Sequence, residues 1–109
     1  MGIKQIHQPL KQFLSYLPRN IKVDQLIIFG SHMEGRATAD SDIDVLVISD
    51  AFKKLDEDQR LDILYDATDD IQPDIHPWGF TKEELQTASH LTLLGYARDH
   101  GIHFPTKSA

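Results

Sequence analysis

The sequence predicts an α/β fold in which helices flank a small mixed sheet. The chain has 109 residues, the usual size of one compact domain. Short apolar runs typical of buried strands alternate with segments that carry apolar residues at helical spacing. The chain has no cysteine, which excludes a disulfide scaffold, thiolate zinc sites and a cysteine nucleophile. We therefore predict that residues 1–109 form a single domain with a conventional apolar core.

The N-terminal half predicts one helix and two strands. A helix over residues 6–17 is indicated by an apolar stripe, with Pro9 in its first turn and Pro18 at its end. A strand over residues 23–29 follows and is closed by Gly30. The alternation over residues 43–49 predicts the second strand. The apolar stripe of the first helix consists of Ile6, Leu10, Phe13, Leu14 and Leu17.

The C-terminal half predicts a helix, a third strand and further helix. Residues 50–69 are charged and favour a helix with an apolar stripe. A strand over residues 74–80 contains Pro77 and follows Pro73, which indicates an edge strand or an irregular one. Thr81 and Glu84 form a capping box that opens a helix, and helical pattern resumes until Gly101. Residues 102–104 predict a last short strand. The stripe in 50–69 consists of Leu55, Leu61, Leu64 and Ala67.

The charge and hydropathy of the chain restrict its partners. The formal net charge is −6, so we expect no extended nucleic-acid surface. An acidic surface favours a small anionic substrate carried with metal ions, or a basic protein. No apolar run reaches the roughly 20 residues of a membrane span, and residues 1–10 do not have the pattern of a signal peptide. We therefore expect a cytoplasmic protein.

The segment from Gly30 to Val47 contains the residues that could bind a ligand or take part in catalysis. Gly30 permits a tight turn and a close approach to the backbone, and free N–H groups after Ser31 at a short helix start favour phosphate. Asp42 and Asp44 lie two positions apart at a strand start, so both carboxylates point to one face. Without a cation this pair repels, at a cost of about 2 kcal/mol for partly hydrated charges about 7 Å apart. The repulsion motivates a metal site without requiring one.

This segment resembles a known family. The pattern Gly30-Ser31-x-x-x-Gly35, five residues, then Ser41-Asp42-x-Asp44 is similar to the signature of the DNA polymerase beta-like nucleotidyltransferases in their minimal form. The resemblance extends over nearly the whole chain, because a third strand with a carboxylate and a capped helix follow. It implies the polymerase beta-like nucleotidyltransferase fold.

The resemblance also implies roles for individual residues. It places Gly30, Ser31, Gly35 and Ser41 against the nucleotide and makes Asp42 and Asp44 ligands of Mg²⁺, with Asp74 as the candidate third ligand and two ions expected. Asp74 is the candidate for the third carboxylate, which helps to deprotonate the attacking hydroxyl. Asp69 and Asp70 are rivals for this role, but they lie at an expected helix end. The implied reaction is attack of a hydroxyl on the α-phosphorus of ATP or another NTP, with pyrophosphate leaving.

One position departs from the family pattern. Many members carry a basic residue before the second glycine, whereas here Glu34 occupies that position and Arg36 follows Gly35. Arg36 is a candidate for a phosphate contact. The alternative is weaker nucleotide binding.

Several side chains have a plainer interpretation beside the functional one. Asp42 and Asp44 without the glycine turn would be ordinary turn residues. His76 shares a strand face with Asp74 and is a candidate to line the site. His32 either touches phosphate or is an exposed loop residue. Trp78 either stacks on a base or, as favoured for an aromatic residue at strand spacing, packs in the core.

Small stand-alone members of the family resemble the antitoxin of HEPN/MNT toxin–antitoxin pairs. That resemblance implies a helical HEPN-family protein as partner and transfer of AMP to a tyrosine of that toxin. One alternative is adenylylation of a cationic small molecule such as an aminoglycoside, with an acceptor site at the interface of a homo-oligomer. Another is a non-catalytic module that neutralises its partner by contact. Intact Asp42, Asp44 and Asp74 argue against the last alternative.

Overall fold

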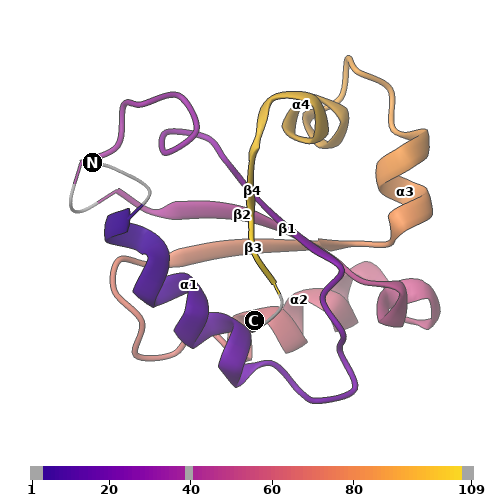
Figure 1. The fold of residues 1–109 in the computed structure, drawn as a ribbon. Coiled ribbons are helices and arrows are strands. Elements are labelled where there is room, and N and C mark those ends of the chain that lie inside the picture. Colours follow the sequence, from indigo (N-terminus) through magenta and orange to yellow (C-terminus); the bar gives the residue numbers. More distant parts are fainter. Residues whose placement is uncertain (1–3, 39–40, 107–109) are drawn as a thin grey trace.

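The computed structural model describes residues 4–38 and 41–106. A four-stranded mixed sheet is flanked by helices (Figure 1). Its strands are β1 (Gln25–Phe29), β2 (Ile43–Ile48), β3 (Ile75–Phe80) and β4 (Ile102–Phe104). The helices are α1 (Lys4–Tyr16), the 3₁₀ helix η1 (Asp50–Lys54), α2 (Glu57–Asp66), α3 (Lys82–Thr87) and α4 (Leu93–His100). The predicted α/β class and mixed sheet are confirmed.

The sheet has the strand order β3-β2-β1-β4. β1 pairs antiparallel with both β2 and β4, whereas β2 and β3 pair in parallel. The parallel pair needs a crossover connection, which η1 and α2 supply. β3 lies at a sheet edge, as Pro73 and Pro77 predict. Proline has no N–H group to donate, and on the outer side of an edge strand no neighbouring strand needs that donor.

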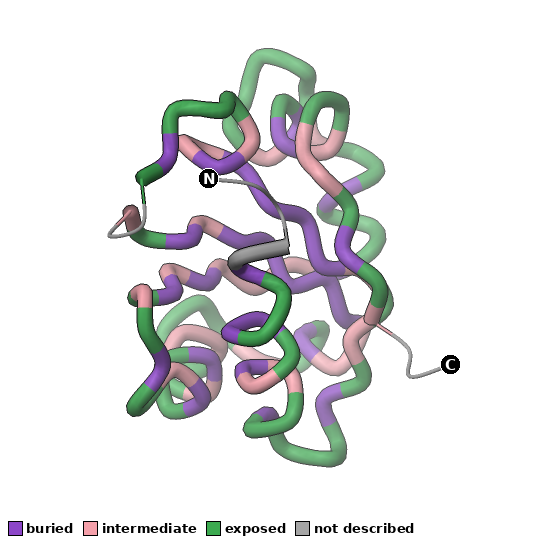
Figure 2. Tube along the Cα trace, turned by 60° about the vertical axis from the view of Figure 1, so that its left-hand side comes forward, coloured by how far each residue is buried: buried purple, intermediate pink, exposed green. Residues whose placement is uncertain are grey.

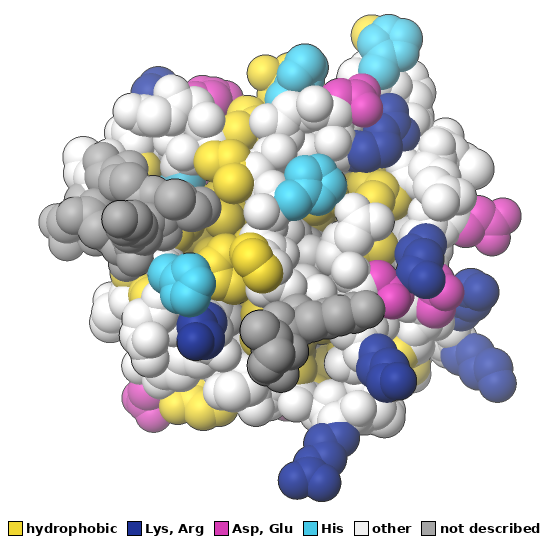
Figure 3. All heavy atoms as spheres, in the orientation of Figure 1, with side chains coloured by type: hydrophobic (Ala, Val, Ile, Leu, Met, Phe, Trp, Pro, Cys, Tyr) yellow, Lys and Arg dark blue, Asp and Glu magenta, His cyan; other side chains and the backbone are white. Residues whose placement is uncertain are grey.

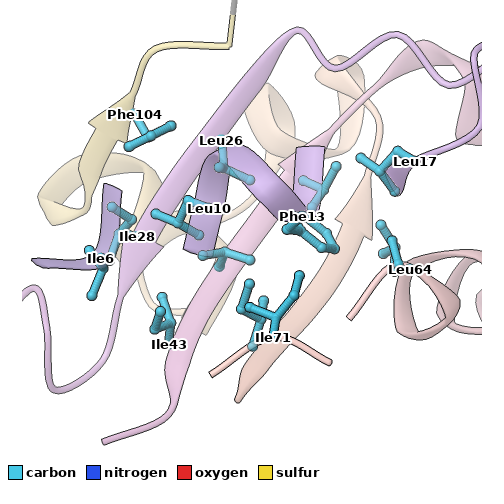
Figure 4. Close-up of a cluster of buried hydrophobic side chains, with 14 of the residues drawn as sticks. Ile6, Leu10, Phe13, Leu17, Leu26, Ile28, Ile43, Leu64, Ile71 and Phe104 are labelled. Atoms are coloured by element: carbon cyan, nitrogen blue, oxygen red, sulfur yellow. The ribbon is translucent and has the colours of Figure 1, made fainter. Parts of the chain in front are cut away.

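The larger part of the core lies between one face of the sheet and the helices α1 and α2. Leu26 and Ile28 of β1 point to this face, as does Ile43 of β2, and all three are fully buried. Figure 4 shows them meeting Phe13 of α1 and Leu64 of α2. Pro9 lies in the second turn of α1 rather than the first, since the helix already includes Lys4. A proline there removes one helix hydrogen bond, which the buried stripe of α1 offsets.

A smaller core covers the opposite face of the sheet. Ile27 and Leu46 point to this face and pack with Leu85 of α3 and Ala97 of α4. Because strand side chains alternate, Asp44, which is two residues before Leu46, points to this same face. The helices α3 and α4 therefore cover the face on which the candidate site residues of β2 lie.

The predicted single helix over residues 50–69 is wrong, because the segment forms two helices. Ser49 caps η1 with its side chain, and the chain then turns extended at Leu55. Asp56 begins α2 with a capping box closed by Gln59. The extended backbone at Leu55 therefore ends η1, and the capping box at Asp56 starts α2. The helical segment after Thr81 is likewise divided into α3 and α4, and Thr92 caps the second.

One arginine ties four elements together at the end of β3. Arg60 of α2 donates to the backbone oxygens of Phe52 and Gly79 at 2.7 and 3.2 Å, and also to that of Leu55. Its guanidinium also donates to the Glu84 carboxylate of α3 at 2.8 Å. The Arg60 side chain is only 13% exposed. We call these five residues the Arg60 cluster.

The surface is mixed in charge on the face seen in Figure 3, where Lys and Arg side chains stand beside carboxylates. Lys82, for example, lies 3.6 Å from Asp24 and 3.8 Å from Asp50. Figure 2 shows the buried segments concentrated in the sheet and on the inner sides of the helices. Among the described residues, no helix is long and apolar enough to cross a membrane.

Candidate active site

One terminus of each of three neighbouring strands lies on the same side of the sheet, which we call the site edge. β1 runs toward this edge, and β2 and β3 both begin there, at the left of Figure 1. Asp44 pairs with Phe29 of β1 on one side and with His76 of β3 on the other. The topology thus brings the glycine turn after β1 and the acidic start of β2 into contact.

Gly30 is shaped around Asp44. Its φ of +72° lies in the left-handed region, which favours glycine. A Cβ atom added at Gly30 would lie 2.4 Å from the Asp44 Oδ2 atom, so any side chain there would displace the carboxylate. The glycine of the predicted motif therefore serves a second purpose, which is to leave room for Asp44 against the backbone.

The segment after Gly30 forms a series of turns, and the predicted short helix at Ser31 is absent. The Gly30 carbonyl accepts from the Glu34 N–H at 3.1 Å, and the Ser31 carbonyl accepts from the Arg36 N–H at 2.9 Å. Gly35 also has a positive φ, of 74°, which ends the regular pattern. Glycine adopts this left-handed conformation readily, so the sequence supplies glycine at both positions where the turns require it.

Asp44 is partly buried, and both like and opposite charges lie near its carboxylate. Burial raises the pKa of Asp44 above 3.8, the charge on His76 lowers it, the like charge of Asp42 raises it again, and His32 lowers it. The balance leaves the pKa raised. A carboxylate that is short of cationic neighbours is a suitable position for a cation.

Asp42 is half-exposed and contacts a histidine. The His76 Nε2 atom lies 3.4 Å from the Asp42 Oδ2 atom. Asp74 precedes β3, and its backbone oxygen accepts from the Ile43 N–H at 2.8 Å. The Asp74 side chain is exposed and lines a surface hollow of about 320 Å³ together with Asp69 and Asp70. The residue of β3 that is in register with Asp44 is thus His76 rather than Asp74.

The remaining predicted nucleotide-binding residues lie in the loop between β1 and β2. The Ser41 hydroxyl oxygen accepts from the Thr38 N–H at 2.9 Å, which ties the start of β2 to the loop. Arg36 is exposed and donates to the Glu34 carboxylate at 2.7 Å. Glu34 therefore offsets the charge of the arginine that was the candidate for a phosphate contact.

His32 is buried near Ser41 and Asp44, although the sequence left it equally open as an exposed loop residue. It is only 8% exposed, its Nε2 atom lies 3.4 Å from the Ser41 backbone oxygen, and its charge acts on Asp44. Its position two residues after a turn-forming glycine is a signal too weak to show this burial. Trp78 packs against Phe29 at 5.5 Å between ring centroids, so the core-packing interpretation of Trp78 is confirmed.

The donor set at this edge fits a divalent cation. Carboxylate oxygens are the ligands of Mg²⁺, and Gly30 leaves open the space into which Asp44 projects. Across residues 4–38 and 41–106, no three His, Asp or Glu side chains are already arranged around one point. Asp42 and Asp44 are the residues that would hold the ion.

The family is decided by the match of the sequence to a family model. The model describes the nucleotidyltransferase domain and matches residues 10–95, which is most of the chain. The chain belongs to the nucleotidyltransferase domain family. The match includes the glycine turn, both carboxylates of β2 and the whole of β3.

Solved structures share the fold of this nucleotidyltransferase. A candidate nucleotidyltransferase from Sulfolobus solfataricus has a TM-score of 0.60 and 18% identity, with 93% of this chain and 77% of that chain covered. A chain of a toxin–antitoxin structure with AMP-PNP has a TM-score of 0.54 and 21% identity, with 94% of this chain and 72% of that chain covered. No curated protein is similar enough in sequence to match. These neighbours confirm the nucleotidyltransferase fold.

Proposed function

We propose that this nucleotidyltransferase transfers AMP from ATP to a hydroxyl group of a protein partner, namely a tyrosine of a HEPN-type toxin. The observation that carries the transfer chemistry is the placement of Asp44 against the glycine turn at Gly30. Backbone N–H groups of a glycine turn suit a triphosphate, and paired carboxylates suit Mg²⁺ bound to that triphosphate. Gly30, Ser31, Gly35 and Ser41 are the proposed nucleotide-binding residues.

The proposed reaction is a single displacement at phosphorus. The acceptor oxygen forms a bond to the α-phosphorus, and the bond from that phosphorus to pyrophosphate breaks. The acceptor proton passes to a base beside the site, for which Asp74 is the candidate from the family pattern. Bound metal ions would stabilise the charge that develops on the phosphate oxygens. Asp42 and Asp44 would hold these ions, and the loop 30–38 would position the triphosphate.

A protein partner is supported by apolar side chains around the start of α4. Leu91, Leu93 and Tyr96 are 85%, 59% and 45% exposed, respectively. We call them the α4 patch. Since α4 covers the sheet face that bears Asp44, a protein seated on the α4 patch would lie on the same side of the sheet as the carboxylates. The structural neighbour described as a toxin–antitoxin further supports a partner of this kind.

A second acceptor is favoured by the hollow next to β3. Asp69, Asp70 and Asp74 line it, together with Tyr65 and His76. An acidic hollow adjoining the site would suit a cationic hydroxyl compound such as an aminoglycoside. Substituting Asp69 and Asp70 by Asn separates the two acceptors, because only transfer to a cationic small molecule should weaken.

The deciding experiment is a transfer assay. The purified protein is incubated with α-labelled ATP and Mg²⁺, with and without the helical protein encoded by a neighbouring gene, and label is located by mass spectrometry. Label on a partner tyrosine, reduced about a hundredfold or more by Asp42→Ala, would support the proposal. A stable complex without label from any NTP would instead favour a module that acts by contact alone.

A further inference from the structure

The third side chain of the site is the feature that the fold leaves to be assigned. Family resemblance pointed to a carboxylate at Asp74, but the pairing of β2 and β3 brings His76 beside Asp44. Residues that are in register on neighbouring strands and point to the same face have adjacent side chains. Asp74 lies two residues before His76, directly before β3, so it is at the level of Asp42 rather than of Asp44.

The contacts of His76 agree with its register. Its Nε2 atom lies 3.4 Å from the Asp42 carboxylate, and of the two histidines near Asp44 it exerts the stronger charge effect. His76 therefore touches one carboxylate of β2 and is adjacent to the other. The Asp74 side chain is exposed, whereas His76 is partly buried, although both line the hollow beside Asp69 and Asp70.

We propose that His76, and not Asp74, completes the metal-binding set with Asp42 and Asp44, and that it makes the site favour Mn²⁺ over Mg²⁺. The proposal rests on the proposed nucleotidyl transfer at this site. Mg²⁺ binds almost only oxygen ligands. Mn²⁺ also binds carboxylates, but it accepts an imidazole nitrogen as well. Replacing a third carboxylate by a neutral imidazole also removes one negative charge, which weakens a site for a hard cation most.

The three side chains do not yet surround one point in the described structure. The Asp42–His76 contact is the pair that an incoming ion would enter between, because both partners are about half-exposed and face the same edge. Binding of the ion is therefore expected to replace a direct contact between two ligands by contacts of each ligand with the ion.

The test measures metal binding directly and does not depend on turnover. Mn²⁺ is titrated into the full chain without nucleotide, and bound ion is counted by loss of the free Mn²⁺ signal in electron paramagnetic resonance. Mg²⁺ affinity is obtained by competition. We expect His76→Asp to shift the ratio of Mn²⁺ to Mg²⁺ affinity about tenfold or more toward Mg²⁺. Asp74→Asn, the matched control on the same strand end, should change neither affinity more than about twofold.

A spectroscopic signature identifies the ligand atom. Electron spin echo modulation of bound Mn²⁺ should show coupling to a ¹⁴N nucleus that disappears in His76→Asp and persists in His32→Gln. The proposal is overturned if wild-type protein binds no Mn²⁺, if the coupling disappears with His32 instead, or if Asp74→Asn weakens binding and His76→Asp does not. Thermal melts of each variant establish that it is folded before its affinity is compared.

Failure of this proposal can be distinguished from failure of the proposed function. If Asp42→Ala abolishes transfer but His76→Asp leaves the metal preference unchanged, the nucleotidyl transfer is supported and the role of His76 is rejected. Selective Mn²⁺ binding through His76 without transfer to any acceptor would do the opposite.

Discussion

The two ends of β3 hold charged groups in opposite ways. At its C-terminal end, the guanidinium of Arg60 is nearly enclosed and donates to backbone oxygens and to Glu84. At its N-terminal end, Asp44 is partly buried beside another carboxylate, with its pKa raised. The first arrangement matches each charge with a partner, and the second leaves negative charge in excess.

Glu84 shows how complete the matching is at the structural end. Partial burial would raise its pKa, but hydrogen bonds from the Thr81 N–H and from Arg60 outweigh burial and leave the pKa lowered. Asp44 has the contrary balance, in which burial dominates. Charge matched in this way stabilises the fold, whereas the excess of negative charge at the other end favours binding of a cation. The charged groups around the two ends of β3 therefore differ in how completely they are compensated.

Removing the arginine should break the structural end. Arg60→Ala removes the side-chain donor to the backbone oxygens of Phe52, Leu55 and Gly79 and the partner of Glu84, which we expect to lower the free energy of unfolding by about 3 kcal/mol. Chemical denaturation monitored by circular dichroism measures the loss. Arg36→Ala is the matched control, because the exposed pair of Arg36 with Glu34 should contribute less than about 1 kcal/mol. Equal losses in both variants would contradict the structural role of the Arg60 cluster.

A methyl group at the glycine turn should damage the functional end. Gly30→Ala and Gly35→Ala both place a side chain at positive φ, so each should destabilise the fold by about 1–2 kcal/mol. Only the Gly30 variant directs its Cβ at the Asp44 carboxylate, since no atom lies within 4 Å of the corresponding position at Gly35. Transfer should therefore fall about tenfold or more further in Gly30→Ala than in Gly35→Ala. Equal activities would show that the close approach of Gly30 is without catalytic consequence.

Removing the excess charge should stabilise the fold, which is the smallest effect of the three. Asp44→Asn keeps the shape and removes the cost of burying a charge together with the repulsion from Asp42, so we expect a gain of about 1 kcal/mol at pH 7 without divalent cations. Because the folded-state pKa of Asp44 is raised above 3.8, its favourable contribution is complete below that pH and is lost as pH rises through the folded pKa.

The gain of the Asn variant over wild type should therefore be absent below about pH 4 and grow toward neutrality. Thermal melts across this range measure it, with Asp74→Asn as the exposed control that should gain less. A loss of stability in Asp44→Asn at pH 7 would show that Asp44 is already compensated in the folded protein.

Much of this fold could be predicted because its signals are local. The apolar run before Gly30, the alternation from Ile43 and the capping box at Thr81 each depend on a few neighbouring residues. The division of residues 50–69 into η1 and α2 also had a local signal, the capping box from Asp56 to Gln59, but the surrounding helix-favouring residues concealed it.

The site could be predicted less completely because its third side chain comes from a distant segment of the sequence. Alternation places Asp74 and His76 on the same face of β3, so the sequence predicts the face correctly for both. A shift of two residues in the pairing of β2 with β3 decides which of them adjoins Asp44, and no periodicity within one strand contains that information. The burial of His32 likewise depends on how the loop folds back toward Ser41.

The crossover between β2 and β3 has a consequence for how the molecule folds. The antiparallel pair β1–β2 joins segments close in the chain, whereas β3 reaches β2 only after η1 and α2 have closed a longer loop. Long-range closure slows folding, so we expect β1 and β2 to associate first and β3 to dock afterwards. The sole tryptophan of the chain, Trp78, lies on β3 against Phe29 of β1. Its fluorescence during refolding would thus report when β3, which also carries His76, docks onto the sheet.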